Sequence, residues 1–139
     1  MDIKRLRYLL LPVVTLVLEL LPYGAVCNFA NPEGDPFRRT FSYFDPVPFG
    51  YANFAPLLTA LLSCVIALLL VIYLFSGSYR VARAADILAL VAAILSLCPL
   101  QMGIHFYSVV GGGISLTLLL EAVWLYVGVV KERKPGSDD

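Results

Sequence analysis

The chain has 139 residues, of which 60% are hydrophobic and 14% are charged, and its formal net charge is zero. Soluble domains carry roughly 45–50% apolar and about 25% charged residues, so this composition excludes an ordinary water-soluble domain. A domain of this length has too little interior to hide so many apolar side chains, and lipid must therefore solvate much of its surface. The balanced charge and the lack of a long basic tract argue against binding to nucleic acid.

Four apolar runs are each long enough to cross a membrane. They cover residues 6–26, 54–75, 84–100 and 109–130. A helix rises about 1.5 Å per residue, so roughly 17–25 residues span about 30 Å of hydrocarbon. Helices are expected because lipid offers no partner to an unpaired backbone group. The sequence therefore predicts an all-α membrane protein, with residues 1–139 forming a single bundle of four transmembrane helices.

Positively charged residues predict how this bundle is oriented. Eight of the ten Lys and Arg residues fall on one side of the four runs, and Arg38 and Arg39 lie on the other. The eight are Lys4, Arg5, Arg7, Arg80, Arg83, Lys131, Arg133 and Lys134. Such residues favour the cytoplasmic side, so we expect both termini and the turn at 76–83 in the cytoplasm, in a bacterial-type plasma membrane.

The first apolar run also has the basic start and apolar stretch of a cleaved signal peptide. Glu19 and Pro22 fit poorly in the apolar region of such a peptide. We therefore expect the first run to be retained as a helix.

Small side chains recur every four residues on the second and third runs. Ala85, Ala89 and Ala93 lie on one face of the third run, and Thr59 and Ser63 lie on one face of the second. Close packing of small residues drives helix association in lipid. We expect these two helices to form a tight antiparallel hairpin, although alanine is also common in membrane helices without such a role.

Residues 27–53 form the predicted outer loop, which is long for a connection and rich in aromatic residues. Disordered segments are poor in aromatics. We expect this extracytoplasmic loop to fold over the end of the bundle or to lie among the lipid headgroups. Its Asn-Pro-Glu-Gly-Asp-Pro stretch predicts a tight turn. The following Arg-Arg-Thr-Phe-Ser-Tyr-Phe stretch predicts a short strand. Candidate surface residues for a ligand or partner are Arg38, Arg39, Tyr43 and Phe44, and the alternative is an aromatic lid that anchors the protein at the interface.

Glu19 and Glu121 are acidic residues well inside the predicted first and fourth helices. A charge at such a depth costs roughly 2.5–3.5 kcal/mol, so these side chains are expected to face the bundle interior or water. Helical rise places Glu19 roughly 18 Å and Glu121 roughly 15 Å from the inner surface, with Ser63 and Ser96 near that level. Two nearby carboxylates in a low dielectric cannot both ionise easily, which would suit binding of a proton or cation. The alternative is structural, with each Glu hydrogen-bonded to a neighbouring helix.

Asp86 is expected in the first turn of the third helix, three residues after Arg83, where it would interact favourably with the helix dipole. Cys27 and Cys98 lie at the outer ends of their predicted helices, where they either form a disulfide or serve as small buried side chains. No spacing of residues predicts a metal site, a cofactor or a catalytic constellation.

These patterns predict a small integral membrane protein without enzymatic activity, acting as an accessory or interaction protein. Its partners would be the lipid bilayer and either a second copy of the chain or another membrane protein. The alternative is a small proton- or cation-coupled transporter that uses Glu19 and Glu121.

Overall fold

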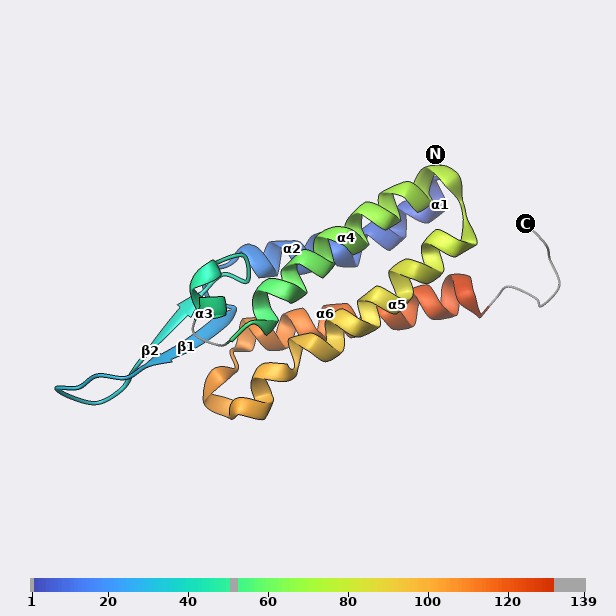
Figure 1. Cartoon of the computed structure of the whole chain (residues 1–139). Coiled ribbons are helices and arrows are strands. Elements are labelled where there is room, and N and C mark those ends of the chain that lie inside the picture. Colours follow the sequence, from blue (N-terminus) through green and yellow to red (C-terminus); the bar gives the residue numbers. More distant parts are fainter. Residues whose placement is uncertain (1, 51–52, 132–139) are drawn as a thin grey trace.

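A computed structural model describes residues 2–50 and 53–131, and this part of the chain is mostly helical. Three helices are long and apolar enough to cross a membrane. They are α4 (Ala55–Ser76), α5 (Tyr79–Ser96) with the 3₁₀ segment η2 (Cys98–Met102), and α6 (Val109–Leu125) with the π-helical segment η4 (Tyr126–Val130). The prediction of a mostly helical chain with membrane-spanning helices is confirmed for these three (Figure 1).

The N-terminal helical run consists of α1 (Ile3–Leu6), the 3₁₀ segment η1 (Arg7–Leu9) and α2 (Leu10–Leu20). It packs mainly against α6 and also against α4. The predicted helix over 6–26 is wrong at its C-terminal end, because Leu21 already has an extended backbone with ψ 137°. Pro22 explains this early end, since proline disfavours helical backbone in the residue before it and cannot donate to the helix.

The chain then forms an antiparallel hairpin of β1 (Ala25–Phe29) and β2 (Phe37–Phe41), in which Ala25 pairs with Phe41 and Phe29 with Phe37. Asn31 closes the turn, because its side-chain oxygen accepts from the Glu33 amide at 3.2 Å. The predicted turn and second strand are confirmed, whereas the first strand lies partly where a helix was expected. The hairpin projects away from the ends of the helices (Figure 1).

After β2 the chain returns to the helices. The Tyr43 amide donates to the Glu19 carbonyl at 2.9 Å. The short helix α3 (Pro46–Gly50) follows, with the Asp45 carboxylate accepting from the Val47 amide at 2.9 Å. The region predicted as a loop over 27–53 is therefore a projecting hairpin and a short helix, and its second half rather than the whole segment packs on the helices. Residues 51 and 52 of the predicted loop lie outside the described residues.

Helices α4 and α5 form the most extensive helix pair in the structure. Gly77 turns the chain with a φ of +64°, which glycine tolerates, and its amide donates to the Tyr73 carbonyl at 2.8 Å. Because the turn is this tight, α5 begins at Tyr79, five residues earlier than predicted. Ala85, Ala89 and Ala93 are fully buried, so the predicted tight hairpin is confirmed.

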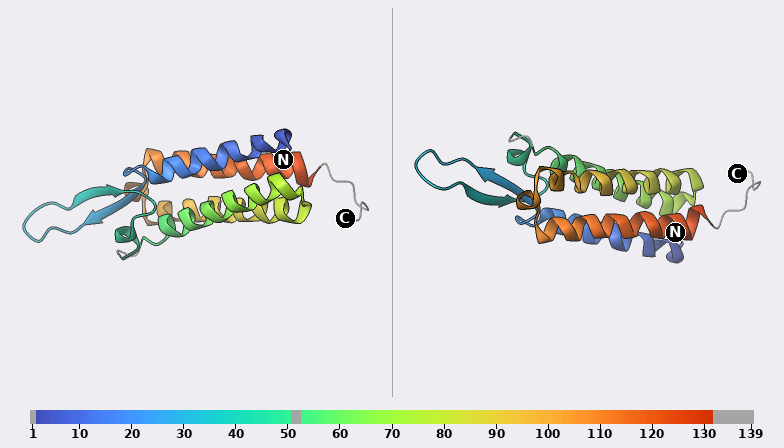
Figure 2. Two further views of the ribbon diagram at one scale, coloured as in Figure 1. Left: turned by 90° about the horizontal axis from the view of Figure 1, so that it is seen from above. Right: turned by 90° about the horizontal axis from the view of Figure 1, so that it is seen from below.

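The long helices run side by side, and both views in Figure 2 show the β-hairpin at one end of them. This end is called the hairpin end below. The start of α1, the α4–α5 turn and η4 lie at the opposite end (Figure 1). Helix α2 therefore runs toward the hairpin end and α6 runs away from it.

Candidate functional site

The interior of the helices contains two acidic side chains. Glu19 on α2 is fully buried, and Ser63 on α4 donates a hydrogen bond from Oγ to its Oε1 at 2.7 Å. Glu121 on α6 is 2% exposed. Among the described residues, Glu19 Oε2 and both carboxyl oxygens of Glu121 are the buried side-chain polar atoms that have no hydrogen-bond partner.

A threonine pair fixes the relative height of the two carboxyl groups. Thr15 Oγ1 on α2 lies 2.8 Å from Thr117 Oγ1 on α6 and 2.9 Å from the Leu11 carbonyl oxygen. Glu19 is one turn beyond Thr15 toward the hairpin end, and Glu121 is one turn beyond Thr117 toward the opposite end. Their backbones are therefore staggered by about two turns, or roughly 12 Å along the axis.

The prediction that Glu19 and Glu121 share one level is therefore wrong for their backbones. The predicted depths were counted by helical rise from Arg7 for Glu19 and from Lys131 for Glu121, as if these two residues lay in one plane, whereas the threonine contact sets the actual register. Helical side chains tilt toward the N-terminus of their own helix, so the two carboxyl groups lean toward each other.

Ser96 belongs to a different hydrogen-bond network. Its Oγ lies 2.8 Å from Ser115 Oγ, and Ser115 Oγ lies 2.6 Å from the Tyr107 hydroxyl. The predicted belt of Glu19, Glu121, Ser63 and Ser96 thus divides in two. The structure joins Ser63 directly to Glu19 and places Ser96 with Ser115.

Sequence reasoning missed Thr15 as a member of the site. Thr15 is fully buried and connects α2 to α6 between the levels of the two carboxyl groups. Its position could have been found, because it precedes Glu19 by four residues and must share its helical face. The Tyr107–Ser115 contact carried no comparable sequence signal.

Of the four residues predicted to form an outer surface, only two are exposed. Arg38 and Arg39 are exposed, and Arg38 Nη2 donates to the Tyr107 carbonyl at 3.3 Å. Phe44 is half-buried against the helices. Tyr43 is 2% exposed, so its assignment to the surface is wrong.

Two glycines explain why the Tyr43 ring can enter the interior. A Cβ atom at Gly24 would lie 2.8 Å from Tyr43 Cδ1, and one at Gly111 would lie 3.2 Å from the Tyr43 hydroxyl. Burial raises the pKa of the Tyr43 hydroxyl, and Tyr107 and Glu19 act in the same direction. Tyr43 therefore stays protonated, and its neutral hydroxyl group lies close to Gly111.

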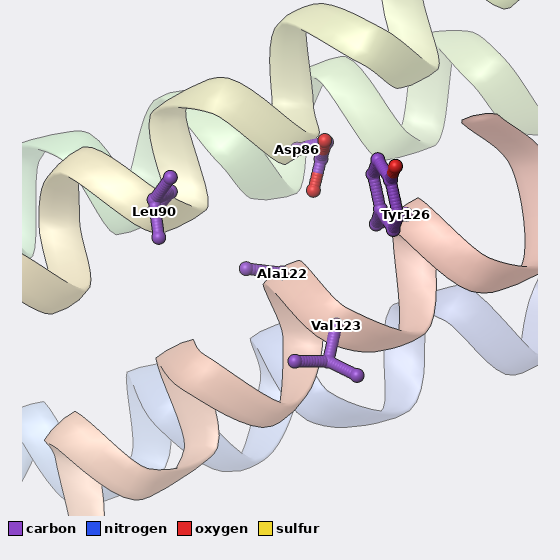
Figure 3. A pocket seen from close by; sticks show the side chains of 5 residues that line it. All are labelled: Asp86, Leu90, Ala122, Val123 and Tyr126. Atoms are coloured by element: carbon purple, nitrogen blue, oxygen red, sulfur yellow. The ribbon is translucent and has the colours of Figure 1, made fainter. Parts of the chain in front are cut away.

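Asp86 lines a pocket between α5 and α6, together with Leu90, Ala122, Val123 and Tyr126. Figure 3 shows its carboxyl group beside the Tyr126 ring, across the pocket from the α6 backbone. The placement of Asp86 in the first turn of α5 is wrong, because the helix begins seven residues earlier at Tyr79. Asp86 thus cannot act mainly on the start of the helix dipole, whose effect fades after the first turn.

Cys27, Cys64 and Cys98 are free thiols in the structure. Burial and the nearby Asp45 raise the pKa of Cys27, which keeps this thiol protonated and unreactive. Within residues 2–50 and 53–131 no group of three His, Cys, Asp or Glu side chains is arranged to hold a metal ion.

The chain was compared with protein-family models, with curated proteins and with solved structures, and none of them matches it.

Proposed function

We propose that this chain is a non-enzymatic accessory or interaction protein of the plasma membrane. It has four transmembrane helices, an extracytoplasmic hairpin end and both termini in the cytoplasm. The N-terminal run over residues 3–20 supplies the fourth helix, since it is about 27 Å long and packs against α4 and α6. Among the Lys and Arg residues that the structure describes, Arg38 and Arg39 alone belong to the hairpin end, which supports this orientation.

The outward faces of the helices support a lipid environment. Large apolar side chains are exposed along all four of them, as expected where hydrocarbon rather than water is the solvent. Examples are Val13, Val17, Leu61, Leu68, Ile87, Ile94, Leu116 and Val123. The partners proposed for this exterior are the bilayer itself and a second copy or another membrane protein. Nucleic acid has no place in the proposal.

The observation that carries the accessory role is the exposed, projecting hairpin. Residues 30–39 are all exposed, and Thr40, which follows them, is half-buried. A two-stranded hairpin is at best marginally stable in water, and the outer edge of a strand such as β2 is a template for pairing with a further strand. An extended segment of a partner can add to such an edge, while Arg38 and Arg39 select acidic side chains on it.

A crosslinking experiment tests this role. A photoreactive residue replaces Arg39 on the hairpin or, as the control, Ile87 on the lipid-facing side of α5. The expected result is one discrete adduct from position 39 in membranes, and its loss when Arg38→Glu is added. Identical products from both positions, or an adduct that survives Arg38→Glu unchanged, would contradict a specific hairpin contact.

A second function, a small proton- or cation-coupled transporter using Glu19 and Glu121, is favoured by a separate observation. Three buried carboxyl oxygens in these residues have no hydrogen-bond partner in the described chain. Intramembrane ionisable groups of this kind mark ion and proton pathways. Proton or cation flux into liposomes should fall strongly when both residues become Gln, and unchanged flux would count against transport.

A further inference from the structure

We infer that Glu19 and Glu121 form a proton-binding pair that exchanges one proton and carries at most one negative charge. The inference uses the same residues as the transporter alternative, but it concerns occupancy of the site and holds whether or not any ion crosses the membrane.

The Glu121 carboxyl group is buried without a compensating partner among the described residues. Glu121 is 2% exposed and neither of its carboxyl oxygens has a hydrogen-bond partner in the described chain. An unpaired carboxylate in an apolar interior is so costly that the group takes up a proton instead. Glu121 is therefore the member of the pair that holds the proton at rest.

Glu19 is less strongly driven to the neutral form. Ser63 donates to its Oε1 at 2.7 Å, and a hydrogen bond donated to a carboxylate stabilises the charged state. This difference between two otherwise similar residues separates their roles. Glu19 is the member that ionises first, and its charge then disfavours a second charge on Glu121, because the two carboxyl groups lean toward each other.

The groups facing the pair do not supply a positive charge. Besides Glu121, the titratable groups that interact electrostatically with Glu19 are Tyr43 and, on α4, Cys64, and neither of them is cationic. The ion pair that the described residues contain joins Arg5 to Asp2 at 3.5 Å, near the start of α1 and away from both carboxyl groups. Neutralisation of the pair therefore has to come from a proton or a bound cation.

The stagger of the two carboxyl groups favours the proton. A hard metal cation such as Ca²⁺ needs six to eight oxygens around it, whereas a proton needs one. With backbones offset by about two turns, the pair cannot bring its four carboxyl oxygens together around one metal ion. The Thr15–Thr117 pair lies between the two levels and separates the two carboxyl sites.

Dicyclohexylcarbodiimide provides a test, because this apolar reagent adds to protonated carboxyl groups inside membranes. The full-length protein in detergent is treated over a range of pH, and the adduct is located by peptide mass spectrometry. We expect Glu121 to be the principal site. Its labelling rate should fall about tenfold for each pH unit above the midpoint, as for a single titrating proton.

Two variants test whether Glu19 and Glu121 titrate as a coupled pair or independently of each other, and a third variant is the control. Glu121→Gln should remove the main adduct. Glu19→Gln should shift the midpoint of Glu121 labelling to lower pH, because it deletes the neighbouring charge. Glu33→Gln makes the same chemical change on the exposed hairpin turn and should leave the labelling profile as in the wild type.

Several results would overturn the inference. One is labelling of Glu121 that does not depend on pH, or no labelling of either residue in folded protein. Another is protection by sodium relative to choline at constant pH, which would identify a cation site. The wild-type profile alone decides these points if a variant fails to fold. A pH-dependent profile without any liposome flux would reject transport and leave the proton-binding pair standing.

Discussion

At the scale of single residues, one tightly constrained contact lets the Tyr43 ring lie inside the hairpin end of the helices. Gly24 contacts the side of this ring, and Ser108 donates from Oγ to the Gly24 carbonyl at 2.6 Å. The ring cannot turn away easily because it is 2% exposed and enclosed. Absence of a side chain at Gly24 is therefore a packing requirement.

Gly24→Ala tests this requirement. The added methyl group would lie 2.8 Å from Tyr43 Cδ1, so the ring or the backbone must shift. Overpacking of this kind costs about 1–3 kcal/mol, and thermal unfolding in detergent should register it. Gly50→Ala is the matched control, because nothing lies within 4 Å of its added atom. Equal stability of the two variants would show that Tyr43 is not held by this contact.

The sequence identified the residues of the candidate site better than their arrangement. Glu19 and Glu121 stand out because acidic residues are costly inside apolar runs, and both are buried as expected. Their stagger depends on how α2 and α6 slide past each other, which is set by the contact between Thr15 and Thr117. Register between helices distant in sequence is a property of packing, and one sequence alone does not reveal it.

At the scale of elements, α5 is the helix on which the packing depends, because it contacts both α4 and α6 extensively. Its alanines allow this close approach, and Ala89 is fully buried near the middle of the helix. Without a hydrophobic driving force in lipid, such contact supplies much of the association energy.

Ala89→Leu should therefore separate α5 from its neighbours. We expect a loss of about 1–3 kcal/mol in folded-state stability, since a larger side chain must displace packed helices. Val91→Leu, which adds a methylene at a position that is 46% exposed, should change stability little. Both variants can be compared by thermal unfolding in detergent, and equal losses would show that the alanine face is not a tight interface.

Elements were predictable where composition alone decides them. The limits of α4, and those of α6 taken together with η4, match the predicted helices to within a residue or two because their apolar runs are uninterrupted. Pro22 was the signal that marked the end of the first helix. That helix was predicted to extend too far toward its C-terminus, because Ala25 and Val26 continue the apolar run. Their strand conformation comes from pairing with β2, a partner that begins some ten residues later.

At the scale of the whole molecule, the exposed apolar side chains and the two distinct ends describe one arrangement in a membrane. The described residues place α1, the α4–α5 turn and Lys131 at one end, and the hairpin at the other. Large apolar residues cover the sides between them. If lipid surrounds those sides, a side chain that is exposed in the structure need not be accessible to water.

Cysteine labelling distinguishes these two quantities. In a variant whose three native cysteines are replaced, single cysteines are introduced as Asp35→Cys on the hairpin turn, Ser76→Cys at the end of α4, and Val17→Cys on α2. All three positions are exposed in the structure. A membrane-impermeant maleimide should label position 35 in intact cells and position 76 only after the membrane is opened. Position 17, though 54% exposed, should stay unlabelled in both cases because it faces hydrocarbon.

Rapid labelling of position 17 would mean that water reaches α2 and that the N-terminal helix does not span the membrane. Labelling of position 76 in intact cells would reverse the orientation, since the positive-inside bias assigns that end to the cytoplasm.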